Sequence, residues 1–196
     1  MNPGRAPSGP LLVLLNCPAL TGPKLVSLLY WLRELNAHVA VIVETHAASD
    51  PADMLRREPG TGSIWPGVRL FHTPGDGHSL GVLVILGPGA DITDPVAYTA
   101  VSGEGRVLRI DCSIMGRPAS LVGVYAPAQT AERPAFYRSF LPQFLPSDGR
   151  VLVMAGDSNC VQTQEDCVYS GAQPAFFFFF MEQEFHPPWG GSDDVG

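Results

Sequence analysis

The side chains best suited to chemistry in this 196-residue chain are polar residues that follow runs of apolar residues. Asn16 follows the run LLVLL, Glu44 follows VAVIV, and Tyr125 follows SLVGV. Asp157 and Asn159 follow VLVMAG, with a serine between them. A single acid after a strand is most often a turn or helix-capping residue, so each position alone is a weak signal. Together the five residues offer two carboxylates, two amides and a phenol to one site.

These side chains fit the metal-assisted cleavage of a phosphate ester. Glu44 offers the carboxylate oxygen that a hard cation such as Mg²⁺ prefers, with Mn²⁺ as the alternative. The amides of Asn16 and Asn159 can ligate a cation, or they can hydrogen-bond a phosphate or a carboxylate. Asp157 can orient and deprotonate a water molecule, and the Tyr125 hydroxyl can hold a phosphate oxygen. A bound metal would stabilise the charge that develops on the leaving oxygen and the phosphoryl group.

A strand–helix–strand unit is the first element that must position these residues. Residues 11–15 and 39–43 are short apolar runs, typical of buried strands. Between them, leucines at helical spacing predict an amphipathic helix over residues 24–36, which starts after Thr21. This order favours parallel neighbouring strands in a layered α/β fold. The strand ends of such a fold converge on one edge, where ligands bind.

Antiparallel strands are expected in the middle of the chain. Residues 67–72 and 79–86 bracket the turn TPGDG, and residues 106–114 alternate in polarity before the turn MGRP leads into a further strand. Residues 47–66 are polar and rich in proline and glycine, which predicts a loop.

A helix and a last clear strand follow. The helix is expected over residues 130–145, with Thr130 as its cap and with Phe136, Phe140 and Phe144 on one face. The strand is expected over residues 151–155. The predicted fold class is therefore α/β, with mixed sheets and helices on their outer faces.

The charge distribution gives no sign of a nucleic-acid-binding stripe. Residues 1–150 contain 12 acidic and 12 basic residues, and the seven acids after Arg150 account for the net charge of −7. The lack of a basic stripe counts weakly against a DNA substrate, because a few arginines suffice for phosphate contacts.

The remaining composition is that of a folded protein in a reducing compartment. Four cysteines show no CxxC spacing, so free buried thiols are favoured over a zinc site. The apolar run at residues 11–15 is shorter than a secretory h-region, and no stretch reaches transmembrane length. We expect an intracellular protein, nuclear or cytoplasmic, that is a monomer without contact to a membrane. The sequence indicates no protein partner.

Five motifs in order resemble the endonuclease/exonuclease/phosphatase family. They are LLNCPAL, VETH, SLGVLVIL, VYAP followed by ERPAFY, and GDSNCV, and together with Asp166 they cover residues 11–168. Within the family, the chain looks most like the apurinic-type endonuclease domain of non-LTR (LINE-type) retrotransposons.

The resemblance implies a four-layer α/β sandwich of two mixed sheets and Mg²⁺-dependent nicking of DNA to prime reverse transcription. It implies that Glu44 is the principal metal ligand and that Asn16 lies beside the metal and the phosphate. It further implies that Tyr125 contacts the scissile phosphate, and that Asp157 and Asn159 handle the attacking water and the phosphate.

The sequence departs from the family pattern in two ways. Val43 stands where the family usually has glutamine, Ala19 where it has glycine, and Ser158 where it has phenylalanine. None of these changes removes a catalytic atom. The family also continues with a second aspartate, a serine/arginine-rich motif and a closing aspartate–histidine pair, and no residues here match them.

We therefore expect a partial domain over residues 11–168 whose sandwich is incomplete at its C-terminal end. Residues 169–196 are an unmatched tail in which five consecutive phenylalanines fit no amphipathic pattern. Either that run is one buried segment, or the tail comes from translated non-coding or frame-shifted sequence; we favour the second. The expected activity is weak or absent. Two alternatives stay open: a non-catalytic retrotransposon remnant, and a phosphatase or phosphodiesterase of the same family acting on a phosphate ester outside nucleic acids.

Overall fold

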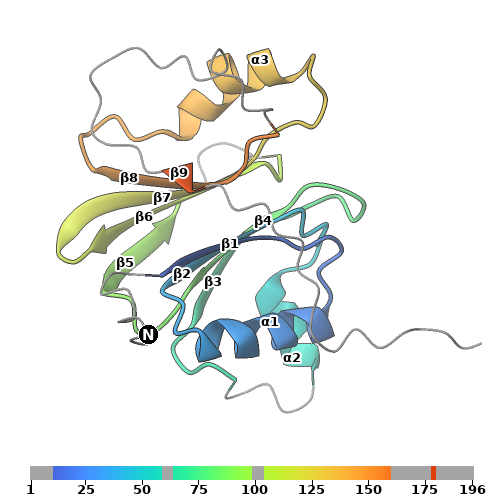
Figure 1. Ribbon diagram of the computed structural model, residues 1–196, viewed down its shortest axis with the longest axis vertical. Helices are drawn as coiled ribbons and strands as arrows, with labels where there is room; N and C mark the ends of the chain where they lie inside the picture. Colours follow the sequence, from blue (N-terminus) through green and yellow to red (C-terminus); the bar gives the residue numbers. More distant parts are fainter. Residues whose placement is uncertain (1–10, 59–63, 99–103, 160–177, 180–196) are drawn as a thin grey trace, which may run out of the picture.

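A computed structural model describes residues 11–58, 64–98, 104–159 and 178–179. In this part of the chain the strands form two mixed sheets (Figure 1). Sheet A has the order β1-β2-β4-β3 and sheet B the order β5-β6-β7-β8-β9. The strands of sheet A are β1 (Leu12–Asn16), β2 (Val39–Val43), β3 (Arg69–Thr73) and β4 (Val82–Leu86). Those of sheet B are β5 (Ile92–Ala97), β6 (Val107–Ile114), β7 (Arg117–Tyr125), β8 (Val151–Asp157) and β9 (Phe178–Phe179).

Helices cover the outer face of each sheet, so the predicted four-layer sandwich is confirmed (Figure 1). Helices α1 (Gly22–Glu34) and α2 (Pro51–Arg57) lie against sheet A. A helical segment over residues 133–144 lies against sheet B. Three buried apolar clusters separate the layers, one between the two sheets and one under the helices on each side.

The β1–α1–β2 unit forms as its sequence predicts. The Thr21 hydroxyl caps α1 by accepting from the Lys24 N–H at 3.5 Å. Four leucines at helical spacing bury the inner face of α1: Leu25, Leu28, Leu29 and Leu32. Strands β1 and β2 pair in parallel, with Asn16 opposite Val43.

The predicted antiparallel strands are also present. Strand β3 pairs with β4, and β6 pairs with β7 through the turn at Met115 and Gly116. At Gly123 of β7, an added Cβ would lie 2.7 Å from the Val82 side chain of sheet A. Glycine at this position lets the two sheets approach closely.

Strand β5 was not predicted from the sequence. It is an edge strand that contains Pro95, and its register with β6 shifts between Thr93 and Val96. A proline and a bulge are typical of an edge strand, and they erase the alternation on which strand prediction depends.

The prediction of a loop over residues 47–66 was wrong in part, because α2 lies within it. The Asp50 carboxylate accepts from the Ala52 N–H at 2.7 Å, and Pro51 occupies the first helical position. This pair is a strong helix-start signal inside a polar segment.

The helix expected over residues 130–145 begins later and is not one regular α-helix. It starts with α3 (Arg133–Ala135), continues as a π-helical turn (Phe136–Phe140) and ends as a 3₁₀ turn (Leu141–Phe144). Thr130 does not cap it, since the residue at the N-cap position is Glu132, which makes no side-chain capping bond. The predicted aromatic face is confirmed: the Phe136 and Phe140 rings stack at a centroid distance of 5.5 Å, and the Phe140 and Phe144 rings lie tilted at 5.3 Å, with Phe136 and Phe144 buried.

The C-terminal predictions fall largely outside the described residues. Strand β8 ends at Asp157, and Phe178–Phe179 pair in parallel with it as β9. The origin of residues 169–196 stays a prediction. Among the described residues, Cys17 and Cys112 are free and buried, and no helix is long and apolar enough to cross a membrane.

Candidate functional site

The carboxyl ends of four strands meet at one edge of the sandwich. Strands β1 and β2 of sheet A run in parallel, as do β7 and β8 of sheet B, and Tyr125 lies directly opposite Asp157. Strand β2 contacts both β7 and β8, and β1 contacts β8, so the two pairs of strand ends lie together. The structure thus brings Asn16, Glu44, Tyr125 and Asp157 to a common edge, as their places after strands predicted.

Strand alternation turns three of these side chains toward the space between the sheets. Leu14 of β1 belongs to the apolar cluster between the sheets, and Asn16 continues that face. Tyr125 packs against the same cluster, and Asp157 lies two residues after Ala155, another of its members.

Glu44 reaches the same space by a different route. Val39, Val41 and Val43 face the other sheet, so alternation alone would turn residue 44 away from it. Glu44 instead has a φ of 56°, in the left-handed region that non-glycine residues seldom occupy. This kink ends β2, and Glu44 Oε1 lies 2.6 Å from the Tyr125 hydroxyl, which donates a hydrogen bond to it. The bond ties the two sheets together at the candidate site.

The surroundings of Tyr125 keep its hydroxyl protonated. Burial, the hydrogen bond to Glu44, and the negative charges of Glu44 and Asp157 all raise the pKa of Tyr125 above its ordinary value. The Arg106 guanidinium opposes this shift. Tyr125 is thus a hydrogen-bond donor at neutral pH, suited to an anionic oxygen, and not a base.

Asp157 and Asn159 form a tight corner with the chain that follows β7. Asp157 Oδ1 accepts from the Asn159 N–H at 2.7 Å, and the Asn159 Nδ2 donates to the Ala126 carbonyl at 2.7 Å. The Ala126 N–H in turn donates to the Asp157 carbonyl at 2.8 Å. Asn159 has a φ of 48°, which asparagine tolerates better than most residues. These bonds fix the Asp157 carboxylate against the Tyr125 strand end.

Gly156 is required for that corner to form. A Cβ at Gly156 would lie 1.8 Å from the Val124 carbonyl oxygen of the neighbouring strand. The glycine in GDSN therefore has a packing role, which is to let β8 run close to β7 just before Asp157.

Two further residues at this edge were missed from the sequence. The Tyr137 hydroxyl donates to the Ser158 carbonyl at 2.7 Å, which holds the residue between Asp157 and Asn159. Arg106 places its guanidinium carbon 5.9 Å from the centroid of the Tyr125 ring. Tyr137 lies in the motif ERPAFY, which could have drawn attention to it, whereas the sequence around Arg106 gives no such signal.

The oxygen atoms present suit a hard divalent cation. Asn16 Oδ1 is buried and has no hydrogen-bond partner among the described residues, which is costly unless a ligand satisfies it. The Glu44 carboxylate is the acidic group at the neighbouring strand end. In the described part of the chain, no group of three or more His, Cys, Asp and Glu side chains gathers as a metal cluster. The donors at these two strand ends are amide and carboxylate oxygens, which a hard cation such as Mg²⁺ or Mn²⁺ prefers.

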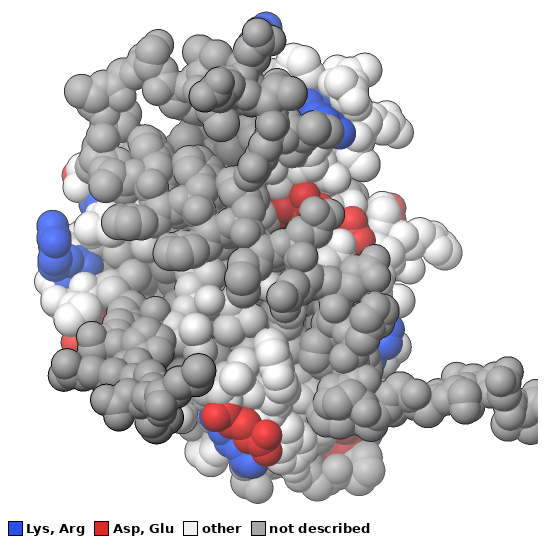
Figure 2. Space-filling model, in the orientation of Figure 1, with Lys and Arg blue, Asp and Glu red and all other residues white. Residues whose placement is uncertain are grey.

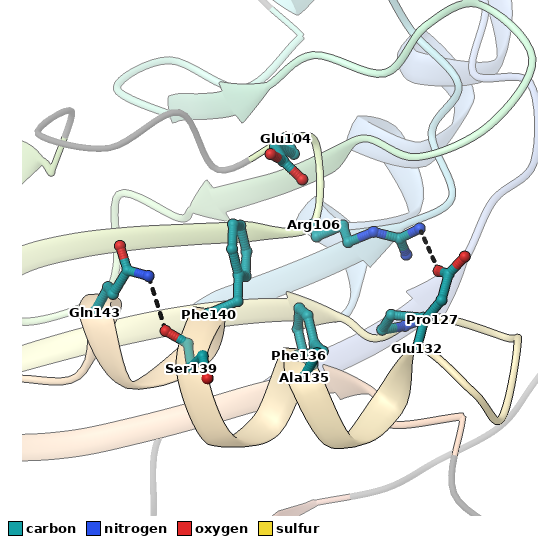
Figure 3. Close-up of a pocket in the computed structure, with 9 residues that line it drawn as sticks. All are labelled: Glu104, Arg106, Pro127, Glu132, Ala135, Phe136, Ser139, Phe140 and Gln143. Atoms are coloured by element: carbon teal, nitrogen blue, oxygen red, sulfur yellow. Dashed lines mark hydrogen bonds and ion pairs between the residues drawn. The ribbon is translucent and has the colours of Figure 1, made fainter.

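An open groove of about 350 Å³, lined by both charged and apolar side chains, lies between Glu104 and Arg106 on one side and the helical segment on the other (Figure 3). Arg106 extends across it to Glu132, 3.9 Å from Nη2 to Oε2. Glu104 lines the same groove. On the face drawn in Figure 2, the Lys and Arg atoms of the described residues lie in separate patches rather than in one band. This agrees with the absence of a basic stripe in the sequence.

Comparison with known proteins identifies the fold. No protein-family model matches the sequence, and no curated protein matches it. Solved structures do match. An AP endonuclease from Leishmania major has a TM-score of 0.54 at 20% identity, over 82% of this chain and 58% of that one. The endonuclease domain of TRAS1, a telomere-specific non-LTR retrotransposon, has a TM-score of 0.51 at 14% identity, over 78% of this chain and 62% of that one.

A third match is TDP2 of D. rerio, humanized by 14 mutations, with a TM-score of 0.51 at 14% identity over 77% of this chain and 63% of that one. The chain thus spans between 58% and 63% of the length of these three structures. All belong to the endonuclease/exonuclease/phosphatase superfamily, so the resemblance expected from the motifs is confirmed at the level of the fold.

Proposed function

We propose that the chain is a divalent-metal-dependent phosphodiesterase that nicks DNA, as the endonuclease domain of a LINE-type retrotransposon. The hydrogen bond between Tyr125 and Glu44 carries this proposal. It joins, across 81 residues of sequence, the expected metal ligand and the expected phosphate contact at one edge of the sandwich. A purely structural cap at each strand end would not require these side chains to meet.

Each residue would have a separate task in the reaction. Glu44 and Asn16 Oδ1 would hold Mg²⁺, which when bound neutralises charge on the phosphoryl group and the leaving oxygen. Asp157 would orient the attacking water and accept its proton, and the Asn159 N–H fixes that carboxylate through Oδ1. When substrate binds, Tyr125 would exchange Glu44 for a phosphate oxygen as the acceptor of its single O–H, and its raised pKa keeps that proton in place.

The solved structures that share the fold support DNA as the substrate class. One is named an AP endonuclease and one the endonuclease domain of a non-LTR retrotransposon. A D. rerio TDP2 structure with a TM-score of 0.51 at 14% identity is described as complexed with a single-stranded DNA product. The motif order of this chain favours the retrotransposon branch over members that act on lipid or inositol phosphates.

We propose weak activity for the chain as given. The sequence contains no match to the closing aspartate–histidine pair of the family, and that histidine stabilises the transition state in the proteins it resembles. Loss of one preorganised transition-state donor lowers kcat by about 10²–10³-fold.

A plasmid-nicking assay with Mg²⁺ tests the proposal. Conversion of supercoiled to open-circular DNA by the full chain should be slow, and it should cease with EDTA and with Glu44→Gln or Asp157→Asn. Glu34→Gln, an exposed acid at the C-terminal end of α1, is the matched control and should nick at the native rate. Nicking that survives both site substitutions would refute the site. Absence of nicking by the folded native chain would favour the non-catalytic remnant, and cleavage of a small phosphate ester alone would favour the third alternative.

A further inference from the structure

Arg106 lies beside Tyr125, and Tyr125 lies beside Asp157, along the hydrogen-bonding direction of sheet B. Val107 pairs with Val124, and the Tyr125 N–H donates to the Arg106 carbonyl at 2.7 Å, so the ladder of β6 and β7 continues by one residue. Tyr125 in turn lies opposite Asp157. The backbone of Arg106 therefore lies next to that of Tyr125, and its side chain extends from there to Glu132 at the start of the helical segment (Figure 3).

The guanidinium of Arg106 is held only weakly in the absence of a ligand. Its contacts with the described residues are the Tyr125 ring, 5.9 Å from guanidinium carbon to centroid, and Glu132, 3.9 Å from Nη2 to Oε2. The Glu132 side chain is 50% exposed, so this ion pair is long and solvent-screened, and such pairs add little stability. By contrast, hydrogen bonds already hold the guanidinium of Arg133 on the same edge, because it donates to the Pro127 and Ala128 carbonyls at 3.1 and 2.6 Å.

We propose that Arg106 is a phosphate-binding residue of this site, and that Glu132 is the counterion that it exchanges for a phosphodiester oxygen of the substrate strand. This inference rests on the proposed function and adds a subsite to it. The planar guanidinium can donate to two phosphate oxygens at once. The long ion pair to a single carboxylate oxygen of Glu132 leaves this capacity unused. The groove beside it supplies the space into which the side chain already extends (Figure 3).

The charges of the groove limit the subsite to one phosphate. Glu104 and Glu132 line the groove together with Arg106, so a second phosphate placed there would meet carboxylates and no further cation among the described lining residues. Removal of Arg106 should therefore abolish one phosphate contact and no more. Removal of the Glu132 charge should have the opposite effect, because the arginine then loses its competing partner.

Anisotropy of a labelled single-stranded oligodeoxynucleotide, measured with the full chain in EDTA across a range of salt concentrations, tests this without turnover. We expect Arg106→Gln to weaken binding about tenfold and to lower the slope of log affinity against log salt by about 0.7, the value for one phosphate on a single strand. Glu132→Gln should tighten binding severalfold. The control is Arg138→Gln, which removes an exposed arginine from the same helical segment and should leave the slope unchanged.

Each outcome of this binding experiment supports or refutes the proposed subsite. If the native chain binds but Arg106→Gln behaves like Arg138→Gln, the subsite is wrong while the proposed function stands. If Glu132→Gln weakens binding, the exchange of partners is wrong. If the native chain does not bind the strand at all, the subsite is refuted, and the plasmid-nicking assay separately decides whether DNA is the substrate. Unfolding midpoints of the three variants within a few degrees of the native value exclude misfolding as the cause.

Discussion

Removal of the Tyr125 hydroxyl tests whether the bond between the sheets prepares the metal site. Tyr125→Phe keeps the ring that packs against the core between the sheets and deletes only the donor to Glu44 Oε1, 2.6 Å away. This bond holds the Glu44 carboxylate, which follows a backbone turn with a φ of 56°, in its observed orientation. Without it the carboxylate should rotate, and the proposed metal ligand should become less well placed.

Two independent magnitudes agree on the size of the effect. A hydrogen bond to a charged group contributes about 1.5–3 kcal/mol. Loss of an outer-shell partner of a metal ligand typically lowers metal affinity about 10–100-fold, which is about 1.4–2.8 kcal/mol. We therefore expect Tyr125→Phe to weaken Mn²⁺ binding at least about tenfold.

Titration of bound Mn²⁺ by electron paramagnetic resonance is a suitable assay, since it requires no activity. Tyr98→Phe is the matched control, because the Tyr98 ring stacks on Arg109 at 4.5 Å, on the side of sheet B that faces the helical segment. Equal Mn²⁺ affinity in the two variants would refute the orienting role. Tighter binding by Tyr125→Phe would mean that the phenol competes with the cation for Glu44.

Four further substitutions probe the corner, the strand ends and the core. Tyr137→Phe removes the hydroxyl that donates to the Ser158 carbonyl and should lower kcat about tenfold with KM unchanged, measured by steady-state nicking; a raised KM with kcat unchanged would point to binding instead. Gly156→Ala should cost about 3 kcal/mol in urea unfolding, because its Cβ meets the Val124 oxygen at 1.8 Å, and a neutral result would mean that β8 can move aside. Ala19→Gly relieves a φ of 54° and should raise stability by up to about 1 kcal/mol in the same assay; a loss would show that chain entropy dominates. Burial lowers the pKa of His72 to about 4, against an opposing effect of Asp50, so protonation favours the unfolded state. Stability should fall by at most about 3 kcal/mol as the pH drops from about 6.5 to 4, and His72→Gln should lose this dependence.

Local signals were sufficient for most of the fold. Strand β2 (Val39–Val43) is buried throughout and flanked by polar residues, so its bounds follow from hydropathy alone. Helix α1 combines a threonine cap with leucines at helical spacing. These elements have strong local preferences that agree with their tertiary environment.

Where the predicted secondary structure was wrong, either the composition of the segment masked a local signal or tertiary contacts determined the structure. Asp50 and Pro51 start a helix, but the short α2 lies in a segment whose composition indicates a loop. The segment over residues 133–144 contains Pro134 and Pro142 and forms three kinds of helical turn in succession. Packing of its phenylalanines on sheet B, and not helix propensity, sets its course.

Part of the candidate site was likewise predictable from local sequence, and part of it was not. Residue types after strands sufficed to select Asn16, Glu44, Tyr125, Asp157 and Asn159. The link from Tyr125 to Glu44 was not predictable, because it depends on a left-handed residue at the end of β2 and on the spacing of the two sheets. The position of Arg106 beside Tyr125 depends on the register of β6 against β7, which hydropathy does not determine.

Anomalous diffraction from crystals of the full chain soaked in Mn²⁺ tests the central claim most directly, since it locates the cation without reference to activity. The account predicts one strong peak between the Glu44 carboxylate and Asn16 Oδ1, at the strand ends where Tyr125 and Asp157 meet them. In Glu44→Gln crystals the same soak should give a much weaker peak. A strong peak elsewhere, or one that persists in Glu44→Gln, would contradict a metal-dependent site at this edge of the sandwich.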